Sequence, residues 1–356
     1  MAVQAIPTIK DIARQLNVSV STVSRALKGH KSIGLRTQMR VKQLASELRY
    51  QPNLNAISFK QKRTFIIGVL IPSLKESFFS EAISGIEDLA QQHKYHVLIA
   101  QSHDDVDREK QVLEAMKNQR VDGVIASLSK HTTDCSHFTD LEHFNIPVVF
   151  FDRVPNRTDV NKVYFNMHSG TSEAVEFLYN QGHRRIALVN GPECMSSSIE
   201  RTHAWKEVMV KKRIKIDMSL VTSTDMTQEG TFAAMETLMA CKPRPTAVVA
   251  MNDYVALDII QYARNTKLKV NKDLCVISYA NLPITNYLET PPMASVEQYP
   301  YQQGAKATEI MMHLLQHHDD MAEKACRHVL INGNLVIHEK KQRSKSIPIK
   351  IAQPVV

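Results

Sequence analysis

The chain has 356 residues, of which 43% are hydrophobic and 22% charged, so it is long enough for two or three domains with buried cores. Residues 1–63 contain twelve Lys or Arg residues and two acids, whereas the rest of the chain contains 32 basic and 34 acidic residues. A basic end on a nearly neutral body is typical of a protein that binds a polyanion. A solvated basic surface without a partner is the alternative.

The five cysteines are odd in number and far apart, and no CxxC motif or Cys/His cluster occurs. We therefore expect neither a disulfide framework nor a metal site. The sequence has no run of about 18 apolar residues and no signal-peptide pattern. These observations predict a cytoplasmic protein with no membrane partner.

The stretch 8–28, TIKDIARQLNVSVSTVSRALK, has the pattern of two short helices joined by a tight turn. Thr8 is expected to cap the first helix and Ser19 the second. Asn17 occupies the turn, because Asn tolerates the left-handed conformation that such a turn requires. A third helix over about residues 36–48 would close a three-helix core. The outward positions of the second helix are Val20, Ser21, Ser24, Arg25 and Lys28.

Two short motifs in this head, TVSR at residues 22–25 and YQPN at 50–53, are specific. With them, the head resembles the lactose-repressor (LacI/GalR) family of bacterial transcription regulators, whose second helix reads the major groove. The resemblance implies base contacts from Val20, Ser21 and Arg25, and phosphate contacts from Thr8, Thr22 and Ser24. Two positions depart from the family: Asn17 replaces the usual Gly, and Gly34 replaces a capping Ser.

Residues 51–63, QPNLNAISFKQKR, have the pattern of a hinge. Pro52 ends the preceding helix, and a new helix over about 54–59 would be too short to be stable alone. The resemblance implies that this segment folds on DNA, pairs across a dimer and inserts Phe59 as a wedge into the minor groove. Packing of Phe59 at the junction between head and body is the alternative. The implied DNA contacts of the hinge are Asn53, Ala56, Phe59 and Lys60.

From residue 64 onward, apolar runs typical of buried strands alternate with helical patterns. One series is FIIGVLIP, HVLIAQ, DGVIASL and PVVFFDR, and the second is RRIALVNG, LVTS, TAVVAM and LCVISY. The expected helices cover about residues 79–93, 108–118, 138–144, 170–181, 198–211, 230–240 and 253–265. The pattern predicts an α/β class with two doubly wound parallel sheets and a ligand cleft between two lobes.

The expected domain organisation is an all-α helix-turn-helix head followed by this two-lobed body. The resemblance continues across the body and adds that it is similar to periplasmic sugar-binding proteins, with three interlobe crossovers near residues 164, 291 and 325. The expected divisions are a head over 1–50, a hinge over 51–63, an effector-binding and dimerisation domain over 64–340, and a flexible basic tail over 341–356. Lobe 1 takes about 64–164 and 292–324, and lobe 2 about 165–291 and 325–340.

The resemblance also implies a set of effector contacts near the strand ends, carried over position by position. These are Phe78, Phe79, Ser127, Asp152, Phe165, Ser197, Arg201, Asn252 and Gln298. Aromatic faces stack on rings, while Asn, Asp and Arg hydrogen-bond hydroxyl or acidic groups, and Arg201 is the strongest candidate. We expect Asp253 to cap the helix that it begins. We expect Trp205, the only tryptophan, to pack in the core rather than touch the ligand.

The segment ISYANLP departs from the family, which has Gly at position 278 and an acidic ligand contact at position 280. Here Ser278 and Ala280 take these places, and Asn281 is a partial substitute for the lost acid. Asn166 likewise stands where Asp is common. These changes leave the effector open between a simple sugar, a phosphorylated sugar and a protein partner.

The favoured function is therefore a homodimeric transcriptional regulator, preferably a repressor, at the nucleoid. It would bind a pseudo-palindromic double-stranded operator and respond to a sugar-like effector in the interlobe cleft. A solute-binding protein without a DNA role is the alternative. No GxSxG, HExxH, P-loop or GxGxxG motif occurs, so we expect no enzyme, no catalytic residue and no cofactor.

Overall fold

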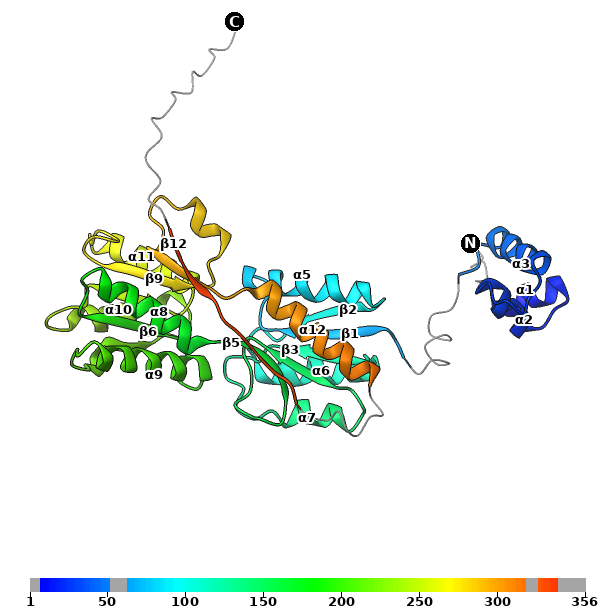
Figure 1. The fold of residues 1–356 in the computed structure, drawn as a ribbon, viewed down its shortest axis with the longest axis horizontal. Coiled ribbons are helices and arrows are strands. Elements are labelled where there is room, and N and C mark those ends of the chain that lie inside the picture. Colours follow the sequence, from blue (N-terminus) through cyan, green and yellow to red (C-terminus); the bar gives the residue numbers. More distant parts are fainter. Residues whose placement is uncertain (1–6, 52–62, 318–325, 339–356) are drawn as a thin grey trace, which may run out of the picture. The chain divides into compact units, whose positions relative to one another are not determined.

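The computed structural model describes residues 7–51, 63–317 and 326–338 and divides the chain into two compact units (Figure 1). The units are Met1–Phe65 and Ile66–Val356. The predicted hinge contacts Asn53, Ala56, Phe59 and Lys60 lie outside the described residues, as does the tail over 341–356. Within the described ranges, no helix combines the length and apolar character needed to cross a membrane.

The first unit is a three-helix head, as predicted, formed by α1 (Ile9–Leu16), α2 (Val20–Leu27) and α3 (Leu35–Glu47). Its core lies between the three helices because the apolar residues recur at helical spacing on their inner faces. The fully or nearly buried members are Ile12, Ala13, Val23, Ala26, Val41 and Ala45.

The turn and the caps of the head confirm the local predictions. Asn17 adopts the left-handed conformation, with φ of 54°, and so closes the turn between α1 and α2. Thr8 caps α1, and the Asp11 carboxylate accepts hydrogen bonds from the Thr8 N–H at 2.9 Å and the Thr8 hydroxyl at 2.7 Å. The Ser19 hydroxyl accepts from the Thr22 N–H at 3.1 Å. Gly34 takes the cap position of α3 with extended backbone.

The second unit contains two six-stranded sheets, as the alternating pattern predicted. In the first sheet all strands are parallel, in the order β11 (His328–Ile331), β5 (Asn161–Phe165), β4 (Val148–Phe151), β3 (Gly123–Ala126), β1 (Ile66–Ile71) and β2 (His96–Gln101). The second has the order β12 (Asn334–Ile337), β10 (Ala294–Glu297), β9 (Cys275–Tyr279), β8 (Ala247–Ala250), β6 (Ile186–Asn190) and β7 (Val221–Ser223), with only β12 antiparallel.

Helices cover both faces of each sheet, which explains why the central strands are apolar on both faces. In the first lobe α5 (Ser77–Gln92) and α12 (Pro300–Gln316) pack together on one face, and α6 (Val106–Asn118) and α7 (Ser136–Glu142) on the other. In the second lobe the pairs are α8 (Met167–Asn180) with α9 (Ser196–Lys211), and α10 (Gln228–Ala240) with α11 (Asp253–Asn265). Short 3-10 helices cover Met218–Leu220 and Pro283–Tyr287.

Two features of the body differ from the prediction. Six of the seven predicted helices, all except α11, begin two or three residues earlier than expected, because a helix end is poorly marked by periodicity alone. The second and third crossovers also come later in the chain than residues 291 and 325. Strand β10 pairs with β9 in the second sheet, whereas β11 pairs with β5 in the first, so the chain changes lobes after β5, β10 and β11 (Figure 1).

The pairing of α5 with α12 in the first lobe depends on two glycines. A Cβ added to Gly85 would lie 2.1 Å from the Tyr301 carbonyl oxygen, and one added to Gly304 would lie 2.0 Å from the Ala82 carbonyl oxygen. Real Cβ atoms do not approach backbone this closely, so the two helices touch only because both positions lack a side chain.

We therefore expect Gly304→Ala to lower the free energy of unfolding by about 1–3 kcal/mol, since the added methyl would force α12 away from α5. Urea unfolding followed by circular dichroism measures this change. Gln302→Ala, at an exposed position of the same helix, should change stability by less than about 0.5 kcal/mol. Equal stability of the two variants would contradict the close contact.

Candidate functional site

A cavity of about 410 Å³ opens between the carboxyl ends of the two sheets in the second unit. Both lobes line it, because loops after parallel strands meet at this edge. The first lobe contributes Phe78, Phe79, Asp152 and Arg153, among others, and the second lobe contributes Ser197, Arg201, Asn252 and Tyr254. Mixed aromatic and hydrogen-bonding walls of this kind suit a small polar ligand.

Arg201, in the second turn of α9, is the most buried cation of the cavity wall, with 3% of its surface exposed. Its guanidinium lies over the Tyr279 ring at 4.2 Å, and Nη2 donates to the Met251 carbonyl at 3.0 Å. Its Nε and Nη1 groups have no acceptor in the described part of the chain. Burial lowers the pKa of Arg201, but a guanidinium stays charged in proteins, so Nε and Nη1 carry three buried N–H donors without an acceptor in the described part of the chain.

On the opposite wall, Asp152 and Arg153 follow β4. Burial raises the pKa of Asp152 to about 6, and the Arg153 guanidinium opposes this effect. Arg153 donates through Nη1 to the Asp104 carboxylate at 2.6 Å and lies 3.7 Å from the Glu76 carboxylate. The charge of Arg153 is therefore largely neutralised within the first lobe. Asp152, with its pKa of about 6, can be protonated or ionised and can hydrogen-bond in either form.

The structure brings together seven of the nine effector contacts predicted for the cavity. Phe78, Phe79, Asp152, Ser197, Arg201, Asn252 and Gln298 line it. Ser127 and Phe165 do not, and their expected ligand contact is not supported by their positions. The Ser127 hydroxyl is fully buried and accepts the Arg153 N–H at 3.4 Å. Phe165 packs edge-on against Tyr279 in the core of the second lobe.

Several wall residues were not predicted. Glu76, Lys130, Asp134, Arg157 and Tyr254 also line the cavity, all from loops or helix starts beyond the strand ends. Arg153, another wall residue that was not predicted, had a signal in the sequence because it continues the FFDR motif. For the loop residues Glu76, Lys130, Asp134 and Arg157, the sequence cannot show which side chains turn inward.

The prediction that Asp253 caps α11 is wrong. The cap is Asn252, whose side chain accepts the Val255 N–H at 2.9 Å while it also lines the cavity. Asp253 is fully buried, and its carboxylate accepts hydrogen bonds from the Ser278 hydroxyl, the Ser295 hydroxyl at 3.0 Å and the Leu282 N–H at 2.6 Å. Its role is structural, as expected, but it fixes the loop after β9 rather than the helix end.

The loop after β9 contains Ala280 and Asn281, where the sequence departs from the family pattern. Ala280 lines the cavity with φ of 88°, so a methyl group stands where the family has a carboxylate. Asn281 does not replace that acid. Its amide donates to the Glu297 carboxylate at 2.9 Å, and its side chain is not part of the cavity wall. Asn166 caps α8, where its side chain accepts the Ser169 N–H at 3.0 Å.

Three hydrogen bonds cross the cavity mouth between the lobes. Lys130 donates to the Asp225 carbonyl at 3.1 Å, the Cys194 thiol donates to the Lys130 carbonyl at 3.3 Å, and the Tyr254 hydroxyl donates to the Lys75 carbonyl at 3.3 Å. Trp205 lies away from the mouth, as expected. It is fully buried in the second-lobe core and donates to the Ile186 carbonyl at 3.0 Å.

The head, considered by itself, presents a polar face on α2. Val20 is 42% exposed, and Ser21 and Arg25 are exposed beside it. Thr22 and Ser24 are half-buried. The Ser19 hydroxyl is within 2.7 Å of the Ser21 hydroxyl and thereby orders the start of the helix. This combination of a small apolar side chain, hydroxyl groups and a guanidinium suits base edges and phosphates.

The raised pKa of Asp152 has a measurable consequence. Because its folded-state pKa of about 6 exceeds its ordinary value of 3.8, its contribution to stability is full below about pH 4 and is lost as pH rises through about 6. Asp152→Asn should thus raise the free energy of unfolding at pH 7 by about 1–3 kcal/mol, with no difference at pH 4. Urea unfolding of both proteins at several pH values from 4 to 7 measures this difference in stability.

Asp159→Asn is the control, because Asp159 is exposed and its hydrogen bond with Arg157 lowers its pKa to about 2. That variant should show no gain in stability at pH 7. If the free energies of unfolding of Asp152→Asn and of the unmodified protein changed in parallel across the whole pH range, the claim that the ionised Asp152 carboxylate destabilises the fold would be contradicted.

Two family models match the chain. Residues 8–53 match bacterial regulatory proteins of the lacI family, and residues 64–339 match the periplasmic binding proteins and sugar-binding domain of the LacI family. Catabolite control protein A of Priestia megaterium is 30% identical over 305 residues, covering 85% of this chain and 91% of the relative. The transcriptional repressor CytR of Escherichia coli (strain K12) is 30% identical over 310 residues, covering 87% and 90%.

Solved structures agree with this fold. The lac repressor dimer bound to operator and the anti-inducer ONPF is similar with a TM-score of 0.79 at 25% identity, covering 93% of this chain and 98% of that one. A complex of the transcriptional regulator CelR with cellobiose has a TM-score of 0.69 at 24% identity, with the same coverage. The chain therefore belongs to the LacI family of bacterial regulatory proteins, DNA-binding transcriptional regulators with an effector-binding domain.

Proposed function

We propose that this chain is a homodimeric repressor whose affinity for operator DNA is set by a sugar-like effector bound between its lobes. The observation that carries the proposal is the cavity shared by both lobes, whose wall includes Arg201, with Nε and Nη1 lacking a hydrogen-bond partner in the described part of the chain. A ligand that supplies acceptors to Arg201 and reaches the Asp152 wall stabilises one arrangement of the lobes over another. Ligand binding of this kind shifts a conformational equilibrium.

The cavity walls favour an uncharged or weakly charged sugar or sugar derivative. Acidic and basic wall residues are nearly balanced, and Phe78 and Phe79 give the first-lobe wall an aromatic surface. Asp152, Arg201 and Asn252 would hydrogen-bond hydroxyl groups, with Ser197 and Gln298 as further partners. The Ala280 methyl supplies no acceptor, so we infer an effector that carries an apolar group, rather than a hydroxyl donor, at this edge.

The α2 face of the head is the proposed DNA-reading surface. Val20, Ser21 and Arg25 would contact base edges in the major groove, while Thr8, Thr22 and Ser24 hold phosphates. Two heads related by a two-fold axis read a pseudo-palindromic operator, and the hinge residues Asn53, Ala56, Phe59 and Lys60 are proposed to contact the minor groove at its centre. The protein would act in the cytoplasm, at the nucleoid.

Coupling between effector and DNA is the central element of the proposal. Allosteric coupling of this type is typically about 1–3 kcal/mol, or a change of about 5- to 150-fold in operator affinity. The lac repressor dimer above was solved with both operator and an anti-inducer, which supports a linked pair of sites in this family. A solute-binding role without DNA is less well supported, because residues 8–53 match the DNA-binding family model.

Arg25→Ala tests the reading surface. The change should weaken binding to the preferred duplex by about 1–3 kcal/mol and relax selection at one base position per half-site, because a guanidinium that bridges a base is lost. Selection from random duplexes, followed by fluorescence anisotropy at fixed salt, measures both effects.

Arg14→Ala is the matched control, since Arg14 is exposed on α1 and already paired with Asp11 at 2.7 Å. It should leave the selected sequence unchanged. An Arg25→Ala variant with the same preferred duplex as the unmodified protein would be inconsistent with placement of α2 in the major groove.

A screen of sugars and sugar phosphates by Trp205 emission tests the cavity. The ring lies in the second-lobe core on the same helix as Arg201, so ligand binding should change its emission. Repeating the screen with operator DNA gives the sign of the coupling. Arg201→Ala should weaken the effector about 10- to 100-fold, because hydrogen bonds to a charged donor contribute about 1.5–3 kcal/mol.

Lys206→Ala, on the same helix but outside the cavity wall, should keep the affinity of the unmodified protein. Both variants should retain operator binding in the absence of effector. If Arg201→Ala bound the effector as tightly as Lys206→Ala does, the proposed ligand contact would be rejected.

A further inference from the structure

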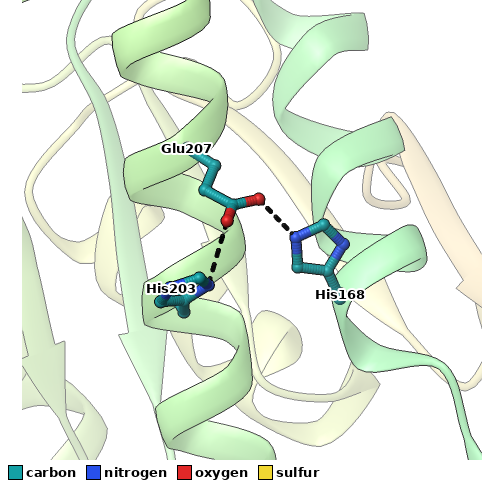
Figure 2. A group of neighbouring side chains, drawn as sticks. All are labelled: His168, His203 and Glu207. Carbon is teal, nitrogen blue, oxygen red and sulfur yellow. Dashed lines mark hydrogen bonds and ion pairs between the residues drawn. The ribbon is translucent and has the colours of Figure 1, made fainter.

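Three side chains that can ligate a metal meet on the surface of the second lobe (Figure 2). His168 lies in the first turn of α8, and His203 and Glu207 lie one turn apart on α9. Their ligand atoms are all within 4.8 Å of one another. His168 Nε2 is 2.6 Å from Glu207 Oε2, and His203 Nδ1 is 3.4 Å from Glu207 Oε1. None of the three lines the effector cavity.

We propose that His168, His203 and Glu207 bind one divalent transition-metal ion, for which Zn²⁺ is the best fit. Two imidazoles and one carboxylate form a known zinc ligand set that leaves the fourth position to water. Mg²⁺ and Ca²⁺ prefer oxygen ligands alone, so two imidazoles select against them. No metal site was expected from the sequence, because His168 and His203 are far apart in the chain and no short motif contains both.

The spacing of the ligand atoms suits a tetrahedral ion. Zinc bonds of about 2.1 Å place neighbouring ligand atoms about 3.4 Å apart. The His203–Glu207 pair already has this separation, at 3.4 Å, and small rotations of the exposed His168 and Glu207 side chains would widen theirs from 2.6 Å. Residues at i and i+4 share one face of a helix, so α9 presents both of its ligands toward α8 (Figure 2).

The local charge also favours a cation. Glu207 supplies a carboxylate that lies 2.6 Å from the His168 imidazole and 3.4 Å from the His203 imidazole. Glu200, on the same helix, is a second carboxyl group that interacts electrostatically with His168. The alternative is a surface His–Glu ion pair without a metal. Such a pair contributes only about 0–1 kcal/mol to stability, and it requires one imidazole, whereas two are present.

An ion at this position would join α8 to α9 near the cleft. Arg201 lies two positions before His203 on α9, and α8 begins immediately after the crossover residue Asn166. The metal would therefore hold together the two helices that support the second-lobe wall. The ion site itself does not depend on the identity of the effector.

Zn²⁺ titration of the full-length protein without an affinity tag tests the site. Calorimetry should show one equivalent of tight binding, and Co²⁺ should give the visible absorption of a tetrahedral site. His168→Gln, His203→Gln and Glu207→Gln should each weaken Zn²⁺ binding about tenfold or more, because every one removes a ligand. Zn²⁺ should raise the unfolding temperature of the unmodified protein, and EDTA should reverse the rise.

His143→Gln, at an exposed histidine that ends α7 in the other lobe, should bind Zn²⁺ as the unmodified protein does. Glu207→Gln is isosteric and exposed, and its circular dichroism spectrum reports whether the fold is intact. Absence of stoichiometric Zn²⁺ binding by the unmodified protein, or full affinity in any one of the three ligand variants, would overturn the proposal.

Discussion

The unpaired N–H groups of Arg201 are the constraint on which the cleft depends. A charged group that is buried with unsatisfied donors costs several kcal/mol, so a ligand that supplied acceptors to Arg201 would reduce this cost. The Tyr279 ring and the Met251 carbonyl fix the guanidinium in place but satisfy only part of it. Under the proposed function, a ligand with hydroxyl groups would supply the missing acceptors. Arg201 would then link the choice of ligand to the arrangement of the lobes.

The three crossovers limit how the lobes can respond. The Asn166 side chain donates to the Asn332 side chain at 2.9 Å, which ties the first crossover to the third. A Cβ on Gly333 would lie 1.9 Å from the Glu297 carbonyl oxygen, so the third crossover also touches the second. The connections thus form one small bundle, while each lobe is a packed sheet between helices. Rotation about this bundle is the motion that the fold permits most easily.

Most of the fold could be predicted from the sequence, because buried strands and amphipathic helices have periodic patterns. The positions of the second and third crossovers could not, since β10, β11 and β12 are short and their pairing is decided by long-range contacts. For the site, motif positions led to Arg201 and Asp152, and both lie in the cavity wall. Ser127 and Phe165 were misplaced, because a position near a strand end does not determine which way the side chain faces. The helix cap was also assigned to Asp253, although Asn252 both forms the cap and lines the cavity.

Asn252 has a consequence for how this protein can change over evolution. Its side chain both caps α11 and faces the ligand, so a replacement that alters ligand preference there also costs about 1 kcal/mol of helix stability. Ser197 lines the same cavity, and its hydroxyl has no hydrogen-bond partner in the described part of the chain. New specificities should therefore arise more readily at Ser197 than at Asn252, and laboratory evolution of a sensor for another sugar should begin there.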